Sequence, residues 1–301
     1  ELLEGFRDFL VRDKPAITTG YNTHGFDWGY IFDRIDMVCG MTSRAAYMSP
    51  ILHHRCQLRT KTFSSSAYGT YTSRYPEIPG LTDMDLYQYV KKTMKLPQYG
   101  LGYVARHVLK NQDKAPLSIK EMNACWYSGE PDRRRLIHMY CLQDTVLPLM
   151  IWASQCILPS VIEMSRVTYV FLTDLFSRGQ SFKVLSQLFI FARNRGYALD
   201  TLPDYSKLNT YQGATVLQME PGFWQDVAVL DFASLYPSIM RALNLCYTSW
   251  DKDPEFEQLP GWTYRHVQTG LGEICFQSTV PGILPLMLEV LGASRSQAKK
   301  A

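Results

Sequence analysis

The sequence predicts an α/β protein. At 301 residues the chain is long enough for about two domains that each bury a core. Residues 16–38 have the pattern of a strand, a turn and a helix, whereas helical patterns dominate residues 132–195. Beyond residue 215 short strand patterns with Pro-Gly punctuation appear, so residues 197–215 are the expected boundary between two parts.

The first part is expected to mix helices and strands. After a helical pattern at the N-terminus, residues 16–22 form an extended segment, Gly25 breaks it, and apolar residues recur at nearly helical spacing from Phe26. Residues 53–80 alternate and are rich in Ser, Thr, Tyr and Gly, which predicts a hairpin or an irregular loop. Residues 85–112 predict two helices separated around Leu96-Pro97, because proline disfavours a helical residue before it.

A long helix is predicted over residues 132–155. Asp132 is its expected N-cap, and Pro148 is expected to kink or end it. Apolar and aromatic side chains are expected on or near one of its sides: Leu136, Met139, Tyr140 and Val146. Two further helical stretches follow at 157–176 and 181–195, the second closed by a C-terminal glycine cap, Gly196.

The second part is expected to begin with strands. The segments "ATVLQM", "DVAVLDF" and "GEICFQS" have strand patterns, and one helix follows Asp231. The chain begins at Glu1 without a methionine or targeting segment, and it ends in "LGASRSQAKKA", a basic helical pattern without a stop signal. We therefore expect an internal piece of a longer polypeptide.

Composition places the chain among ordinary globular proteins. It is 46% hydrophobic and 20% charged, and its net charge of +3 means that any site for a polyanion must be local. The seven cysteines form no CxxC pair, which argues against a disulfide framework and a structural zinc site and favours a reducing intracellular compartment. The apolar stretch 147–164 is interrupted by prolines and polar residues, so no membrane segment is expected.

Asp231 ends an apolar run, "VLDFASLYPSIM", and a helix is expected to start at Ser234. A carboxylate in apolar surroundings is costly unless positive charge lies beside it. Pro237 suits a first helical turn, where backbone N–H groups lack helical partners. A carboxylate beside such N–H groups is suited to magnesium that bridges to phosphate, although a capping or turn aspartate is the alternative interpretation.

The segment "DFASLYPSIM" resembles motif A of family B DNA polymerases, D-x-x-S-L-Y-P-S-I. The resemblance implies that Asp231 binds two catalytic Mg²⁺ ions, with Mn²⁺ as an alternative, and that the carbonyl of Phe232 joins their coordination. It also implies that the backbone of Ser234, Leu235 and Tyr236 cradles the triphosphate of a deoxynucleotide. The ring of Tyr236 would lie under the sugar and exclude a 2′-hydroxyl. Ala233 departs from the usual Asn or Ser, without an evident mechanistic consequence.

Two more segments resemble exonuclease motifs of the same family. "YNTHGFDWGYI" is similar to the second motif, N-x-x-x-F-D, and "YCLQD" to the third, Y-x-x-x-D. Hydrolysis of a phosphodiester by two metals needs carboxylates from several elements. The resemblance implies that Asp27 and Asp144 are metal ligands and that Tyr140 orients the attacking water. Asn22 and Phe26 would contact the frayed 3′ strand.

The resemblance extends over nearly the whole chain. "KLPQYGLGYVARHVL" is similar to a further exonuclease segment, and "RGQSFKVLSQL" to the helix before the palm. "TYQGATVLQMEPGFW" is similar to the region that joins the two domains, which implies that Tyr211, Gly213 and Ala214 lie near DNA. The pattern is nearest to eukaryotic replicative (delta-like) enzymes and those of large DNA viruses.

The resemblance implies a domain order. A ribonuclease H-like exonuclease domain at 1–156 would precede a helical connector at 157–210 and the first part of an α+β palm at 211–301, which ends before the fingers. The implied partners are primer-template DNA, deoxynucleoside triphosphates and a processivity factor, with no membrane. The expected location is intracellular, in a nucleus or at a viral replication site.

Several family elements have no counterpart in the sequence. No first exonuclease motif, D-x-E, precedes Asn22, and the fingers lysine and the D-T-D motif do not occur. We therefore expect the isolated chain to be inactive in both reactions. Two alternatives stay open: a stand-alone 3′–5′ exonuclease with a degenerate palm, and a non-catalytic DNA-binding subunit. His24 is not expected to be a base or ligand, and Asp85 is expected to be structural or capping.

Overall fold

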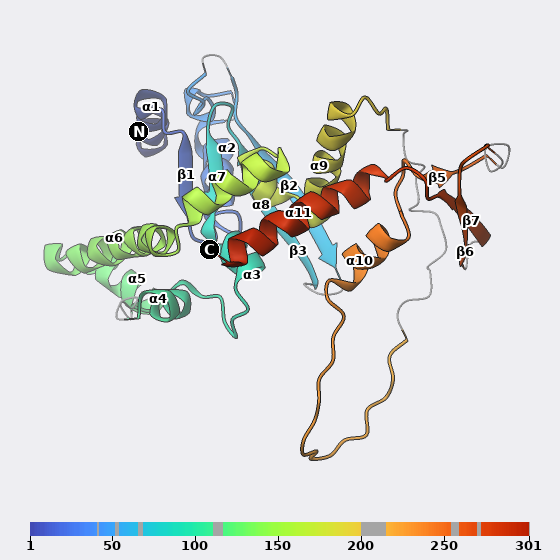
Figure 1. The fold of residues 1–301 in the computed structure, drawn as a ribbon. Coiled ribbons are helices and arrows are strands. Elements are labelled where there is room, and N and C mark those ends of the chain that lie inside the picture. Colours follow the sequence, from blue (N-terminus) through green and yellow to red (C-terminus); the bar gives the residue numbers. More distant parts are fainter. Residues whose placement is uncertain are drawn as a thin grey trace. The chain divides into compact units, whose positions relative to one another are not determined.

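The computed structural model describes residues 1–40, 42–51, 54–65, 69–110, 117–199, 215–253, 259–269 and 272–300. Within them the chain forms two compact units, Glu1–Gln180 and Ser181–Ala301 (Figure 1). The mixed α/β class expected from the sequence is confirmed.

The first unit starts with a helix and a parallel strand pair. The helix α1 (Leu2–Asp13) precedes β1 (Ile17–Gly20) and α2 (Asp27–Cys39), which confirms the strand, turn and helix pattern. Strand β1 pairs in parallel with β4 (Thr82–Asp85), so that Gly20 lies opposite Asp85. Both strands therefore end at the same edge.

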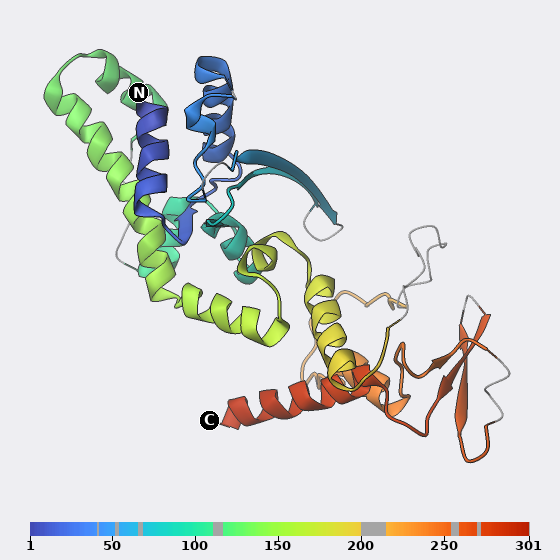
Figure 2. The ribbon, with the colours of Figure 1, turned by 90° about the horizontal axis from the view of Figure 1, so that it is seen from above.

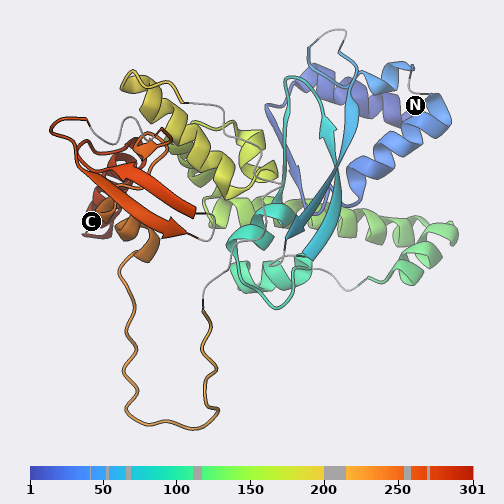
Figure 3. The same cartoon turned by 90° about the vertical axis from the view of Figure 1, so that its right-hand side faces the viewer.

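A long antiparallel hairpin separates β1 from β4 along the chain. Strands β2 (Gln57–Ser65) and β3 (Gly69–Glu77) pair from Gln57 opposite Glu77 to Ser65 opposite Gly69 (Figure 3). The hairpin alternative predicted for this region is confirmed. A short 3₁₀ helix, η1 (Arg44–Ala46), lies before it and packs with α1 and α2 around Phe32, Ile35 and Met48.

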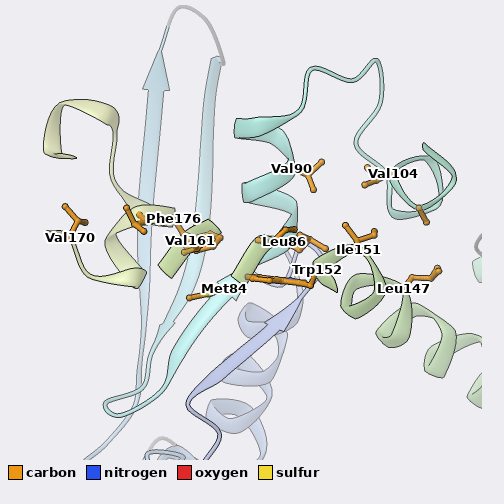
Figure 4. Packing of buried hydrophobic residues seen from close by; sticks show 13 residues of the cluster. Met84, Leu86, Val90, Val104, Leu147, Ile151, Trp152, Val161, Val170 and Phe176 are labelled. Carbon is orange, nitrogen blue, oxygen red and sulfur yellow. The ribbon is translucent and has the colours of Figure 1, made fainter. Parts of the chain in front are cut away.

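Helices make up the rest of the first unit. In chain order they are α3 (Leu86–Thr93), α4 (Leu101–Leu109), α5 (Ile119–Tyr127), α6 (Pro131–Ser154), α7 (Ile157–Thr168) and α8 (Leu172–Ser177). Side chains from β4, α3, α4, α6, α7 and α8 form one hydrophobic cluster (Figure 4). Ile17 and Tyr21, at the two ends of β1, pack against this cluster, so the helices anchor the end of the strand pair.

The long predicted helix is α6, and the structure corrects its N-cap. Its N-cap is Glu130 with Pro131 as the first helical residue, so the Asp132 cap was wrong: a proline at this position needs no N–H partner, and Asp132 lies within the first turn. Pro148 does not end the helix, which continues to Ser154. Leu136 and Met139 are exposed, whereas the buried side is formed further on by Leu147, Pro148, Ile151 and Trp152.

The helical stretch predicted at 157–176 is two helices. Tyr169 ends α7 with a left-handed backbone (φ 55°), and α8 follows. Among the described residues, α6 is the one helix long and apolar enough to cross a membrane. One such helix is weak evidence, since core helices pass the same test, and Leu147 and Ile151 of α6 lie in the protein core.

In its described residues the second unit contains three helices and a small sheet. They are α9 (Gln180–Asn194), α10 (Leu235–Ala242) and α11 (Ile283–Lys300), with strands β5 (Trp250–Asp251), β6 (Tyr264–Thr269) and β7 (Gly272–Gln277) in the order β5-β7-β6 (Figure 2). The sheet is antiparallel. Gly196 has the left-handed φ of 74° expected after α9.

Two of the predicted strands do not form in the part of the chain that the structure describes. Residues 215–219 and 226–232 belong to an extended, exposed segment that runs away from the elements of its unit (Figures 1 and 3). Val229 and Leu230 are 88% and 94% exposed. An apolar run becomes a strand only where another backbone pairs with it, and β5, β6 and β7 pair with one another instead. The third predicted strand, "GEICFQS", is β7.

Candidate functional site

The turn between β1 and α2 carries Asn22, Phe26 and Asp27. Asn22 has a left-handed backbone with φ of 62°, a conformation that asparagine tolerates better than most residues. Its carbonyl accepts the N–H groups of Gly25 (3.0 Å) and Phe26 (3.2 Å). A Cβ atom on Gly25 would lie 2.4 Å from Oδ1 of Asn22, so a larger residue there would displace the Asn22 side chain.

Asp27 is the first residue of α2 and points away from the core. The helix buries Trp28, Phe32 and Ile35 on its inner side, whereas Asp27 is exposed. Partial desolvation nevertheless raises the pKa of Asp27 above its usual value. A carboxylate is a hard oxygen donor, so Asp27 can bind a divalent cation together with other ligands.

An aromatic pair flanks Asp27. Phe26 and Tyr30 are 67% and 57% exposed, and their rings lie parallel, with 6.1 Å between centroids and 7° between planes. Sequence reasoning selected Phe26 but missed Tyr30. The four-residue spacing was the available signal, because residues four apart are neighbours on a helix. The pair offers an exposed aromatic surface beside the carboxylate.

The turn is also tied to β4. Asp85 accepts the N–H of Asn22 (2.8 Å) and of His24 (3.2 Å), and it caps α3 by accepting the N–H of Tyr87 (3.0 Å). The expectation of a capping aspartate at Asp85 is confirmed. The His24 ring bonds to the carboxylate of Asp83 at 2.7 Å.

Tyr140 and Asp144 lie one turn apart on α6, and both are partly buried. Oδ1 of Asp144 is shielded from solvent. One turn further on, Leu147 and Ile151 enter the core that contains Met84 and Leu86 at the end of β4 (Figure 4). The helix that carries Asp144 and the strand pair that leads to Asp27 thus share one core.

Asp231 and its neighbours lie in the second unit. Asp231 is exposed in the extended segment rather than at the end of a strand, because that segment has no pairing strand in the described part of the unit. Ser234 precedes α10 with a left-handed φ of 52°, and Pro237 lies in the first turn as expected. Phe232 and Tyr236 are 74% and 71% exposed, and Leu235 begins the helix. Tyr211, Gly213 and Ala214 lie outside the described residues.

The candidate carboxylates are the right kind of ligand for magnesium, but too few of them lie together in the described residues. Asp27, Asp144 and Asp231 provide the hard oxygen donors that Mg²⁺ and Mn²⁺ prefer. Within the described part of the chain, however, no three His, Cys, Asp or Glu side chains gather closely enough to hold a metal ion. The described residues alone do not form a complete metal site.

Two family models match the chain in succession. The model for the exonuclease domain of DNA polymerase family B matches residues 1–104, and the model for DNA polymerase family B itself matches residues 170–301. The chain belongs to DNA polymerase family B. The first match contains the Asn22–Asp27 turn, and the second contains Asp231 and α10.

Relatives support the same assignment. The chain is 36% identical to the DNA polymerase delta catalytic subunit of Dictyostelium discoideum, over 99% of this chain and 27% of that protein. It is 36% identical to the subunit of the same name from Glycine max, with the same coverage. The family B DNA polymerase of Pyrobaculum calidifontis has a similar structure, with a TM-score of 0.66, 26% identity, and coverage of 100% of this chain and 37% of that one. The chain thus spans about a quarter of the curated relatives it matches.

Proposed function

We propose that this chain is part of a DNA-directed DNA polymerase with 3′–5′ proofreading exonuclease activity, and that it acts in DNA replication. The observation that carries the proposal is the packing of two motif-bearing elements on one core. Ile17 and Tyr21, from the β1 segment that leads into the Asn22–Asp27 turn, pack against the same core as α6, which carries Tyr140 and Asp144, and the turn lies within the exonuclease match. The polymerase motif at Asp231 follows within the second match.

The first unit is proposed to bind the frayed 3′ end of a primer. Phe26 would stack on a base, and the backbone of the Asn22 turn would lie beside the terminal sugar and phosphate. Asp27 and Asp144 would supply two of the carboxylates that hold the metal ions, and Tyr140, one turn from Asp144, would orient the attacking water. Magnesium bound there would stabilise the charge that develops on the attacked phosphate.

The second unit is proposed to bind the incoming nucleotide. The start of α10 offers backbone N–H groups at Ser234, Leu235 and Tyr236, which is a suitable place for a triphosphate. Asp231 and the carbonyl of Phe232 would supply oxygen ligands for the metal ions. Tyr211 and Gly213, from the segment that joins the two parts, would contact the primer-template.

We assign the exonuclease domain to residues 1–156, a helical connector to 157–210 and the start of the palm to 211–301. Family B polymerases and exonucleases depend on metal ions in general. Two Mg²⁺ ions in each site, replaceable by Mn²⁺, fit the carboxylate ligands. The partners are DNA and deoxynucleoside triphosphates, with a processivity factor, and the location is a nucleus or a viral replication site.

The test separates the two reactions. In an active polymerase that contains this chain, Asp27→Ala should abolish excision of a mismatched 3′ end and leave primer extension within about twofold of wild type. Asp231→Ala should abolish extension and leave excision. Equal loss of both activities in both variants would refute the division of the sites.

The isolated chain is proposed to perform neither reaction, because its carboxylates do not complete a metal site in the described residues. Template-dependent incorporation of a nucleotide by the purified 301-residue chain, in Mg²⁺ or Mn²⁺, would contradict this proposal. The Asp231→Ala variant of the same chain serves as the control for a contaminating polymerase.

A further inference from the structure

One buried carboxylate holds the backbone of the turn that leads to Asp27. Asp85 is fully buried at the end of β4. Its Oδ1 accepts the N–H of Asn22 at 2.8 Å, and its Oδ2 accepts the N–H of His24 at 3.2 Å. These bonds connect residues more than sixty positions apart, so they fix the turn to the strand pair and not merely to itself.

Two further hydrogen bonds hold His24, one to its ring and one to its carbonyl. Its ring nitrogen Nε2 lies 2.7 Å from Oδ2 of Asp83, whose Oδ1 accepts the hydroxyl of Thr18 at 2.7 Å. The carbonyl of His24 accepts the N–H of Arg74 from β3 at 3.0 Å. The ring, the amide and the carbonyl of His24 are therefore all bonded to neighbouring strands or their ends.

Capping of α3 alone does not explain why the carboxylate of Asp85 is buried. Ser118 caps α5 with an exposed side chain, in a capping box with Glu121. A buried carboxylate is costly even when it is bonded, and burial raises the pKa of Asp85 although His24 and three N–H groups oppose that shift. The two bonds to the turn are what distinguish Asp85 from an ordinary cap.

We infer that Asp85 is a positioning residue for the exonuclease site, assisted by the Asp83–His24 pair. By holding the amides of Asn22 and His24, Asp85 sets the path of the turn and thereby the places of Phe26 and Asp27. Because its side chain is fully buried, its proposed role is to hold the backbone of the turn and not to bind metal or DNA. This inference rests on the proposed exonuclease function of the first unit.

Asp85→Asn tests the inference with the smallest change. The amide oxygen can still accept the N–H groups of Asn22 and Tyr87, which both bond to Oδ1, but the new NH₂ group faces the N–H of His24, a donor against a donor. Amide hydrogen exchange at His24 should therefore accelerate at least tenfold, while exchange at Tyr87 changes less than threefold. Ser118→Ala, which removes the cap of α5 in the same unit, is the control and should leave His24 unchanged.

The functional measurement uses an active polymerase that contains this chain. Asp85→Asn should lower the rate of excision at least tenfold and raise the Mn²⁺ concentration that half-saturates excision at least fivefold, with primer extension unchanged. Ser118→Ala should alter neither excision value. If Asp85→Asn does not fold, Asp83→Asn replaces it: this change leaves the cap on α3 intact and should accelerate exchange at His24 by a similar factor.

Two results would overturn the inference. One is an unchanged exchange rate at His24 in both aspartate variants. The other is faster exchange at His24 without any loss of excision relative to Ser118→Ala. Absence of excision from the wild-type polymerase would instead count against the proposed function, and the exchange measurement would still decide whether Asp85 holds the turn.

Discussion

The docking of α6 on the core of the first unit can be tested by replacing Ile151 with alanine. Ile151 is 0% exposed, within the cluster that joins α6 to β4 and α3. The substitution removes three carbons, worth about 2.4 kcal/mol at about 0.8 kcal/mol each. The cavity left behind adds to this, so a total loss of about 3 kcal/mol is expected within a range of about 2–5 kcal/mol. For a unit of this size the loss corresponds to a fall in Tm of roughly 6–12 °C.

Leu149→Ala is the matched control, because Leu149 lies two residues away on the same helix and is 56% exposed. It should change the free energy of unfolding by about 0.5 kcal/mol or less. Thermal unfolding followed by tryptophan fluorescence suits the test, since Trp152 belongs to the same cluster. If both variants lose the same stability to within about 0.5 kcal/mol, α6 is not packed on this core, and the placement of Asp144 near the strand pair is wrong.

Three further predictions concern DNA binding, pH and the second unit. Phe26→Ala should weaken binding of a single-stranded oligodeoxynucleotide by about 1–3 kcal/mol in a fluorescence-anisotropy titration, whereas Phe171→Ala, which removes an 81% exposed ring at the N-cap of α8, should not. Because burial raises the pKa of Asp85, the folded state holds its proton more tightly than the unfolded chain. The stability from this proton is present below the unfolded pKa of about 4 and is lost as the pH rises through the folded pKa. Wild type should therefore lose stability between about pH 4 and pH 7 in urea unfolding, whereas Asp85→Asn should not, so the variant gains stability relative to wild type. A difference in unfolding free energy that stays constant over this pH range would refute the sign. The Asn244 side chain bonds to the carbonyls of Gln277 (2.8 Å) and Val280 (2.9 Å) and to the N–H of Gly282 (2.7 Å), so Asn244→Ala should cost about 2–4 kcal/mol in the same assay, and a cost under about 1 kcal/mol would contradict these bonds.

Local features were predictable where neighbouring residues decide the conformation. The β1 turn depends on the left-handed conformation of Asn22 and on the space beside it at Gly25, and both effects act within a few residues. The first turn of α10 accepts Pro237 for an equally local reason. The hairpin of β2 and β3 and the break around Pro97 were likewise predictable from turn residues and alternation.

Features that depend on distant partners were not predictable. The apolar run 226–232 has a strand pattern, yet it remains exposed because no described backbone pairs with it. The sequence also did not indicate which part of α6 enters the core: Leu136 and Met139 are apolar but exposed, whereas Leu147 and Ile151 are buried against β4, α3 and α4.

The sequence by itself determined the family and the chemical character of the candidate sites, since the motifs around Asp27, Asp144 and Asp231 are short patterns of fixed residue types. Only the tertiary structure decided which of these residues share a core and what holds them in place. Asp85 lies 58 positions after Asp27, and its bonds to the turn exist because β1 and β4 pair in parallel and end at the same edge. These hydrogen bonds depend on which distant strands pair with each other, and the residues around one strand do not determine its partner.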